Sequence, residues 1–274
     1  MKTRTISSVV LGMILLVLLI SGGYLLAAVL CAVSLIGFHE MMMAMGIEEE
    51  RKFSSLCAGG YLGTIFHYAG LMFCGKEGEL SWGIWSFLLV FFVTAILYVL
   101  SFPRYDSRQV FCVIFSFFYV PFLLSFIFLI RESKLGIYLA WVPFVAWVCD
   151  IFAYLCGRAL GKRKLVPLLS PKKTVEGALG GILGAALVGM LFGFFVMKTE
   201  SFDSAILWKF ACMTLLGSIL SQFGDLFASG IKRNHNLKDY GHLIPGHGGI
   251  MDRFDSVIFV TPFIYLMLTL FHLI

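Results

Sequence analysis

Residues 205–230, AILWKFACMTLLGSILSQFGDLFASG, are a long apolar stretch, and a polar stretch follows at once at residues 231–255, IKRNHNLKDYGHLIPGHGGIMDRFD. A helix needs about 20 apolar residues to cross the hydrocarbon core of a bilayer, and the first stretch is long enough. From Ser229 to Asp255 the chain places four Lys or Arg, three Asp, three His and five Gly. The two stretches together predict a membrane-spanning helix that leads directly into a loop rich in charged groups.

The whole chain has the composition of a membrane protein. Of its 274 residues, 59% are hydrophobic and 14% charged, and the mean hydropathy is +0.92, which excludes an ordinary soluble domain. We expect an all-α polytopic membrane protein whose first helix is retained after synthesis. Short polar connectors predict about nine transmembrane helices, near residues 5–20, 23–46, 54–74, 82–102, 109–130, 135–156, 177–197, 205–229 and 257–274. The split between the first two is placed at Ser21, Gly22 and Gly23, because one helix over residues 5–46 would be about 60 Å long.

Charge asymmetry predicts the orientation of the spans. With the N-terminus inside, 16 of the 21 Lys and Arg lie in cytoplasmic segments and five lie outside, which favours an N-in, C-out topology. The two long polar loops, 157–176 and 230–256, then face the cytoplasm. We divide the chain into a region with five spans, residues 1–130, and a C-terminal catalytic region with four spans and both loops, residues 131–274.

Two carboxylates lie within or at the edge of apolar helices, at Asp150 and Asp225. An ionisable group in a span must pair, bind a cation or line a wet cavity, so it marks a functional site by default. Helical spacing places Asp225 on one face with polar neighbours, which predicts a polar cavity open to the cytoplasm. These neighbours are Ser218, Ser221, Gln222, Ser229 and Lys232. The alternative for each Asp is a structural salt bridge to a neighbouring helix.

Asp252 and Asp255 are three residues apart, so a helix that begins near Gly249 would direct both carboxylates the same way. Together with Asp225 they could form a site of oxygen ligands. Carboxylates without thiolates or clustered His favour Mg²⁺ or Mn²⁺ over zinc.

Two further segments suit phosphate. His247 lies among Gly246, Gly248 and Gly249, where backbone N–H groups can converge on an anion. In the other loop, Ser170 and Pro171 are expected to form a turn, and Thr174 opens the next span, which leaves Lys172 and Lys173 at a helix N-terminus. The neighbouring cluster Lys162–Lys164 can equally hold anionic lipid headgroups.

The segment from Ser229 to Asp255, together with DIFAYLCGRALGK from Asp150 and SPKKTVEG from Ser170, resembles the signature of the phosphatidate cytidylyltransferases, or CDP-diacylglycerol synthases. The matching positions are Ser229, Lys232, Arg233, Lys238, Asp239, Gly241, Pro245, His247, Gly248, Gly249, Asp252, Arg253 and Asp255. The resemblance covers residues 150–265, whereas the first 130 residues are similar only in being apolar spans.

The resemblance implies transfer of CMP from CTP to phosphatidic acid in phospholipid biosynthesis, at the inner (cytoplasmic) membrane, with the site facing the cytoplasm. It implies Mg²⁺, with room for a second cation, and no nucleic acid partner. Membrane lipids surround the protein, and a homodimer is left open. Asp225 and Asp252 are the expected metal ligands, with Asp255 as a further ligand or as a group that orients a ligand. The expected catalytic residues are Asp225, Asp252, Lys232 and Arg253. The expected substrate-binding residues are Ser170, Lys172, Lys173, Thr174, Ser229, Arg233, Lys238, His247, Gly248 and Gly249.

Two other classes of protein remain alternatives. A membrane transporter also carries charges in its spans, but it predicts broken helices in two similar halves, whereas the polar residues here concentrate in one half. Another lipid-phosphate transferase would carry a differently spaced Asp cluster, and neither a DGxxAR run nor a DDxxD is present.

Overall fold

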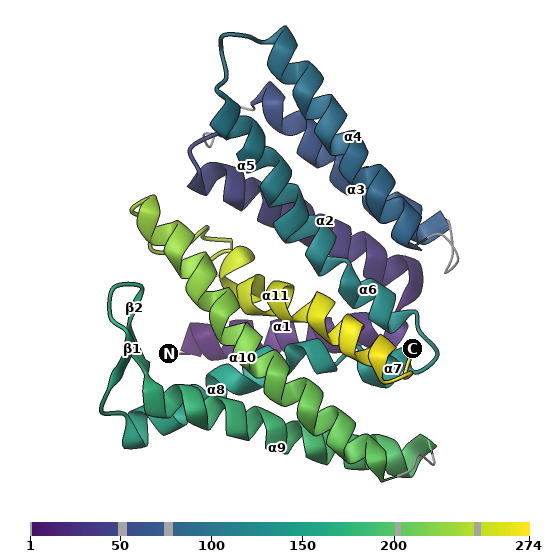
Figure 1. Cartoon of the computed structure of the whole chain (residues 1–274), viewed down its shortest axis with the longest axis vertical. Helices are drawn as coiled ribbons and strands as arrows, with labels where there is room; N and C mark the ends of the chain where they lie inside the picture. The colour runs from purple at the N-terminus through teal and green to yellow at the C-terminus, as the bar shows by residue number, and fades with distance from the viewer. Residues whose placement is uncertain (1, 49–53, 74–78, 201–203, 244–247) are drawn as a thin grey trace. The chain divides into compact units, whose positions relative to one another are not determined.

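The computed structural model describes residues 2–48, 54–73, 79–200, 204–243 and 248–274, and these are almost entirely helical (Figure 1). One two-stranded sheet interrupts the helices. The elements in chain order are α1 (Lys2–Ser21), α2 (Gly23–Ala44), η1 (Ser55–Cys57), α3 (Ala58–Phe73), α4 (Glu79–Leu100), α5 (Ser107–Phe117), η3 (Phe118–Phe122), α6 (Phe126–Arg131), α7 (Gly136–Leu139), η4 (Val142–Phe144), α8 (Val145–Leu160), β1 (Lys164–Val166), β2 (Ser170–Thr174), α9 (Val175–Glu200), α10 (Ala205–Asn234) and α11 (Met251–Leu270).

Within the described ranges, seven helical segments are long and apolar enough to cross a membrane, so the chain has the architecture of an all-α polytopic membrane protein. They are Gly23–Ala44, Trp82–Leu100, Ser107–Arg131, Gly136–Leu160, Val175–Glu200, Ala205–Asn234 and Met251–Leu270. Helices also occupy the two other predicted positions. The apolar part of α1, Val10–Ser21, and the 16-residue α3 are shorter than these seven, so the total of nine spans stays a prediction.

The predicted break between the first two helices is present. Helix α1 ends at Ser21 and α2 begins at Gly23. Gly22 has φ 61° and Gly23 has φ 53°, a left-handed backbone conformation that glycine adopts without steric cost. The two glycines therefore end one helix and start the next with no intervening loop.

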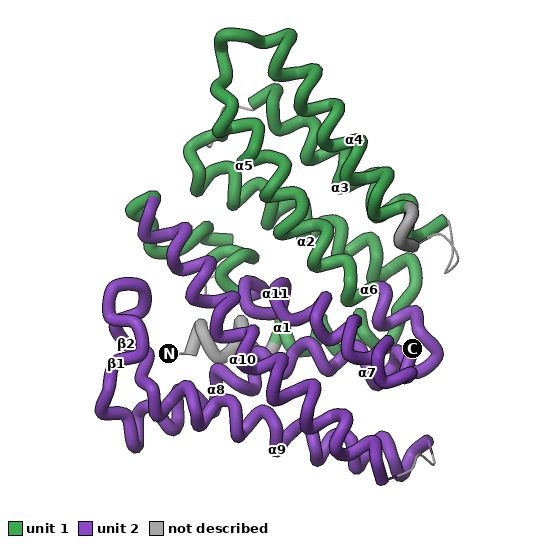
Figure 2. Tube along the Cα trace, in the orientation of Figure 1, with its two compact units in different colours: residues 1–128, 235–253 green, residues 129–234, 254–274 purple. Residues whose placement is uncertain are grey.

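The chain forms two compact units, which Figure 2 shows in different colours. Unit 1 contains residues 1–128 and 235–253, and unit 2 contains residues 129–234 and 254–274. Each is described by itself below. The division of the chain near residue 130 into an N-terminal and a catalytic region stays a prediction.

In unit 1, α2, α3 and α4 pack closely through glycines of α3. A side chain at Gly60 would overlap the ring of Phe38, and one at Gly63 would overlap Val90. Small residues at helix contacts let backbones approach, which is how helices associate where lipid removes the hydrophobic driving force. Buried His67 has polar partners within this apolar unit, because its ring contacts the hydroxyls of Ser86 at 3.1 Å and Ser125 at 2.9 Å.

In unit 2, α8, α9 and α10 lie side by side, and glycines of α9 face both neighbours (Figure 1). Gly181 packs on Cys149 of α8, Gly184 on Phe152 of α8, and Gly189 on Thr214 of α10. Helix α9 is therefore held between the two helices that carry Asp150 and Asp225.

The predicted polar loop 157–176 folds into an antiparallel hairpin instead of staying irregular. Strands β1 and β2 pair with Lys164 opposite Thr174 and Val166 opposite Ser170. The turn occupies residues 167–169, so the prediction that Ser170 and Pro171 form a turn is wrong. Both belong to β2 because the register of the hairpin places the reversal before them.

Side chains of α9 and its cap fasten this hairpin to the helix. The Glu176 carboxylate accepts hydrogen bonds from the backbone N–H groups of Lys162 at 3.0 Å and Arg163 at 3.2 Å. The Thr174 hydroxyl accepts from the N–H of Gly177 at 3.1 Å, as an N-cap residue does. The prediction that Thr174 opens the span is confirmed, and Lys172 and Lys173 stand just before the helix N-terminus.

Candidate functional site

Asp225 forms a salt bridge with Lys173, which joins the middle of α10 to the end of β2. The Lys173 ammonium contacts Oδ2 of Asp225, and the Ser229 hydroxyl donates to Oδ1 at 3.4 Å. The two charged side chains are 25% and 27% exposed, while the Nζ atom of Lys173 itself is buried. A salt bridge, which the sequence left open for Asp225, is thus present, but its partner lies on strand β2 and not on a neighbouring helix. Its partner is one of the two lysines expected to bind phosphate.

Asp255 brings a second carboxylate to the same place from α11. Its side chain is buried, and it lies close enough to Asp225, Lys232 and Asp150 for their charges to act on it. Gly224 explains the approach of the helices, because a Cβ there would lie 2.7 Å from Cβ of Phe259 and 3.2 Å from the carbonyl oxygen of Asp255. The absence of a side chain next to Asp225 therefore lets α11 approach α10 at Asp255.

Lys232 is the buried cation of this group. It is 8% exposed, which is unusual for lysine, and it lies on α10 two turns beyond Asp225. A buried ammonium and a buried carboxylate stay charged only when they balance each other. We name Asp150, Lys173, Asp225, Lys232 and Asp255 the acid–base cluster of unit 2. It gathers three carboxylates and two ammonium groups from α8, β2, α10 and α11.

A cavity of about 290 Å³ opens beside this cluster between α8, the hairpin and α9. Asp150, Arg158, Lys172 and Lys173 are the charged residues of its lining. Three positive side chains around one cavity favour a ligand with several negative oxygens, such as a phosphate chain. Gln222 closes one side, where its amide donates to the Ala178 carbonyl at 3.0 Å.

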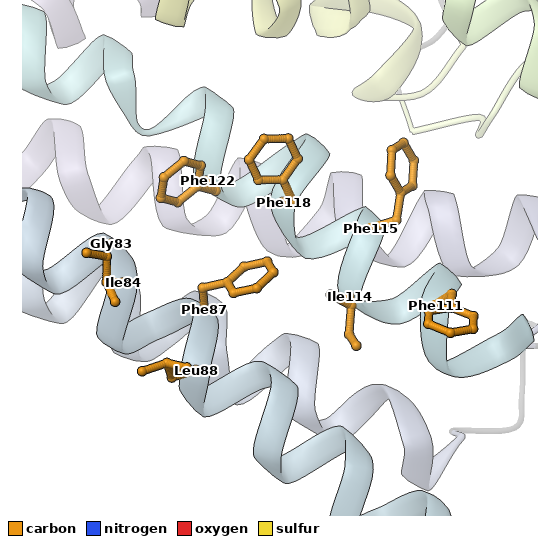
Figure 3. A pocket seen from close by; sticks show the side chains of 9 residues that line it. All are labelled: Gly83, Ile84, Phe87, Leu88, Phe111, Ile114, Phe115, Phe118 and Phe122. Atoms are coloured by element: carbon orange, nitrogen blue, oxygen red, sulfur yellow. The ribbon is translucent and has the colours of Figure 1, made fainter. Parts of the chain in front are cut away.

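The larger cavity of unit 1 has a different character. It has a volume of about 640 Å³, and Figure 3 shows its lining side chains on two helical segments, α4 with Phe87 and α5–η3 with four phenylalanines. Its lining carries no charged or hydrogen-bonding side chain: it consists of Gly83, Ile84, Phe87, Leu88, Phe111, Ile114, Phe115, Phe118 and Phe122. Such a surface cannot bind a phosphate, so we place no chemistry there.

Asp252 has a different environment, within unit 1. Its Oδ2 accepts hydrogen bonds from the backbone N–H of Tyr240 at 2.8 Å and of Gly249 at 3.0 Å, and thereby closes the loop in front of α11. Gly248 has φ 84°, and a Cβ there would meet the Asp252 carboxylate at 2.7 Å. Only glycine fits this position, so Gly248 allows the backbone to approach Asp252 closely.

The other predicted site residues lie on the same elements with more exposure. Arg233 at the end of α10 and Lys238 in the following loop are exposed, and Arg253 is part-buried on α11. Lys232 and Arg233 also suit the negative end of the α10 helix dipole, which gives them a structural role in addition. Ser170 is part-buried at the start of β2. His247 lies outside the described residues, and so do Pro245 and Gly246.

The cluster suits a hard divalent cation, although it is no complete cage. In the described residues no three His, Cys, Asp or Glu side chains are close enough to hold a metal by themselves. Mg²⁺ commonly takes only one or two carboxylates and completes its shell with water and substrate phosphates. Asp225 and Asp255 would fit such a partial set, since they are neighbouring carboxylates with oxygen donors only.

One buried carboxylate was missed by the sequence reasoning. Glu40 is 6% exposed near the end of α2, and its oxygens accept the backbone N–H groups of Ile250 and Met251. A signal was available, because Glu40 is an acidic residue in an apolar span, the same pattern that singled out Asp150 and Asp225.

Comparison with known proteins adds an independent line of evidence. The sequence model of the cytidylyltransferase family matches residues 2–271. The phosphatidate cytidylyltransferase of Staphylococcus saprophyticus is 33% identical over 273 residues, which cover 98% of this chain and 99% of that protein. Those of Staphylococcus epidermidis and Staphylococcus haemolyticus are each 32% identical with the same coverage. A match over nearly the whole length includes the N-terminal spans as well as the signature, and the chain therefore belongs to the cytidylyltransferase family.

Proposed function

We propose that the protein transfers CMP from CTP to phosphatidic acid and forms CDP-diacylglycerol and pyrophosphate for phospholipid biosynthesis. The observation that carries the proposal is the Lys173–Asp225 salt bridge beside a cavity lined by Arg158 and Lys172. It supports the proposal because it brings cations of the kind that bind phosphate next to carboxylates within an apolar membrane protein. Family membership and the names of the relatives support the same reaction.

In this reaction a phosphate oxygen of phosphatidic acid forms a bond to the α-phosphorus of CTP, and the bond from that phosphorus to the bridging oxygen breaks. Pyrophosphate leaves with the electron pair. A phosphomonoester is already a competent nucleophile, so the protein has mainly to position both substrates and to neutralise charge. Lys172, Lys173 and Arg158 would bind the phosphate oxygens of the nucleotide, and Lys232 would hold the carboxylates in place.

Asp225 and Asp255 would hold Mg²⁺, and Asp252, which α11 carries one turn before Asp255, is proposed as a further ligand. When bound, Mg²⁺ would neutralise charge on the leaving pyrophosphate. Ser229 would orient the Asp225 carboxylate through its hydrogen bond. A second cation is compatible with the number of carboxylates present. Ser170, Thr174, Arg233, Lys238, His247, Gly248, Gly249 and Arg253 complete the proposed set of substrate-binding and catalytic residues.

The proposed setting follows from charge distribution. We propose nine spans with the N-terminus in the cytoplasm and the C-terminus outside, in the cytoplasmic membrane, because 16 of 21 Lys and Arg then face the cytoplasm. The hairpin and the loop before α11 would both be on the side where CTP is found.

The test is an assay of the purified protein with CTP labelled in the α-phosphate and with phosphatidic acid in mixed micelles. We expect labelled lipid to form with Mg²⁺ present, and formation to fall to background when EDTA removes the metal and to return when Mg²⁺ is added back. Labelled lipid that forms equally well in EDTA would refute the metal site, and no labelled lipid under any condition would refute the reaction.

Lys172→Gln is expected to raise the KM for CTP about tenfold with little change in kcat, since a hydrogen bond to a charged group contributes about 1.5–3 kcal/mol. Lys173→Gln should raise KM and also lower kcat, because it removes the partner of Asp225. Steady-state kinetics with varied CTP measures both. The matched control is the double variant Lys162→Gln, Lys164→Gln, which neutralises two exposed lysines of the same hairpin. Equal KM values in all variants would assign the hairpin to lipid headgroups.

A further inference from the structure

Glu40 and the loop before α11 form a contact that joins residues 210 positions apart in the chain, within unit 1. The Glu40 carboxylate accepts the N–H of Ile250 at 3.0 Å through Oε1 and the N–H of Met251 at 2.8 Å through Oε2. Both N–H groups belong to the start of α11, where the first turn of a helix has no intrahelical acceptor. A carboxylate is the preferred partner there because it also faces the positive end of the helix dipole.

The loop is shaped around this carboxylate. A side chain at Gly249 or at Gly241 would overlap the Glu40 carboxylate, so each position allows only glycine without displacement. Glu40 is 6% exposed, and Gly249 is buried with it. A buried carboxylate enclosed by backbone on two sides and bonded through both oxygens has little freedom to move. The contact therefore fixes the loop as well as the helix start.

Two carboxylates hold this loop, and each accepts hydrogen bonds from different backbone N–H groups. Asp252 accepts the N–H groups of Tyr240 and Gly249, and Glu40 accepts those of Ile250 and Met251. Asp252 lies in the first turn of α11, directly after the two residues that Glu40 binds. The orientation of the Asp252 carboxylate thus depends on where Glu40 places the helix start.

We propose that Glu40 is a positioning residue for the reaction, which fixes the first turn of α11 and with it the Asp252 carboxylate. The inference rests on the proposed function, since Asp252 is a proposed metal ligand. Within unit 1, Glu40 acts through its two hydrogen bonds to the start of α11. With this role for Glu40, the N-terminal part of the chain contributes to catalysis.

The test is Glu40→Gln, which keeps the shape of the side chain but turns an –NH₂ toward one of the two backbone N–H donors. We expect kcat to fall about tenfold, the size of effect typical of groups that orient a metal ligand, while the KM for CTP stays within about twofold. Hydrogen exchange of the Ile250 and Met251 amides should quicken by about tenfold, because a charge-assisted hydrogen bond to each is weakened.

Glu48→Gln is the matched control. Glu48 is a carboxylate of unit 1 with similar burial, 4% exposed, and it binds His39 and Tyr61 at 2.7 Å, neither of which belongs to the loop before α11. We expect it to leave kcat and the exchange of residues 250–251 unchanged. If Glu40→Gln does not fold, Gly241→Ala takes its place, since the added methyl group displaces a carboxylate that remains charged.

Each outcome decides a different point. Unchanged exchange at residues 250–251 in Glu40→Gln would overturn the positioning role, and so would faster exchange with normal kcat. An equal loss of kcat in Glu48→Gln would reduce the effect to general destabilisation and overturn it too. A wild-type protein that makes no CDP-diacylglycerol would refute the proposed reaction and with it the catalytic role of Glu40. The hydrogen-exchange result would then show only whether Glu40 holds the start of α11.

Discussion

Asp225→Asn is expected to lower kcat for CMP transfer on the order of 100-fold, the loss typical when one electrostatic group leaves a preorganised site. The substitution keeps the shape of the side chain and removes its charge. That charge pairs with Lys173 and lies beside Asp255, so both the lysine and the proposed metal lose a partner. The measurement is single-turnover CMP transfer by purified, inserted protein at saturating Mg²⁺.

Asp106→Asn provides the control for the same chemical change. Asp106 is an exposed N-cap residue of α5 that accepts from the Arg108 N–H, and Asn caps helices about as well as Asp. This variant should keep wild-type kcat. A rate above about one tenth of wild type in Asp225→Asn would contradict a ligand role, since outer-shell substitutions alone typically lower activity 10- to 100-fold.

Asp252→Asn is expected to reduce kcat to a similar extent, and the structure makes this variant informative in another way. One carboxylate oxygen already accepts two backbone N–H groups, from Tyr240 and Gly249. The amide oxygen of Asn can accept the same two bonds, so the loop closure survives the substitution. A loss on the order of 100-fold would then report the missing charge of a metal ligand and not a collapsed loop.

Asp252→Ala separates the two roles further. It removes both the charge and the acceptor, so it should lower kcat at least as much as Asp252→Asn and also quicken hydrogen exchange at Tyr240 and Gly249. Near-normal activity in Asp252→Asn, together with strong loss in Asp252→Ala, would assign Asp252 to loop closure alone. The metal site would then consist of Asp225 and Asp255.

The helices were largely predictable, because long apolar runs in a membrane protein have few alternatives. The break at Gly22 and the N-cap at Thr174 followed from the local chemistry of those residues. Helix α11 begins at Met251, whereas the last span was predicted to begin at residue 257. The prediction was late because Asp252 and Asp255 lower the mean hydropathy of the first turn. The spacing of these two Asp correctly predicted the helical turn that carries them.

The parts that the sequence did not reveal depend on distant partners. Strands of three and five residues leave no period to detect, so the hairpin of β1 and β2 was expected to be a loop. The partner of Asp225 could be named only as some Lys or Arg, because the chain does not state which one the hairpin brings near. Glu40 went unnoticed since its two donors lie 210 and 211 residues away, and the assignment of metal ligands stays a prediction.

The bond between Glu40 and the start of α11 has a consequence for biosynthesis. Translation delivers Glu40 in the second helix, and at about 5–20 residues per second Ile250 and Met251 follow roughly 10–40 s later. During that interval the carboxylate lacks the partners that it has in the finished fold, and an unpaired charge within an apolar helix is unfavourable in the bilayer. The contacts of the N-terminal spans are therefore incomplete until the C-terminal part of the chain has been synthesised. A truncation before residue 250 removes both donors, so the Glu40 carboxylate of such a fragment never gains these two hydrogen bonds.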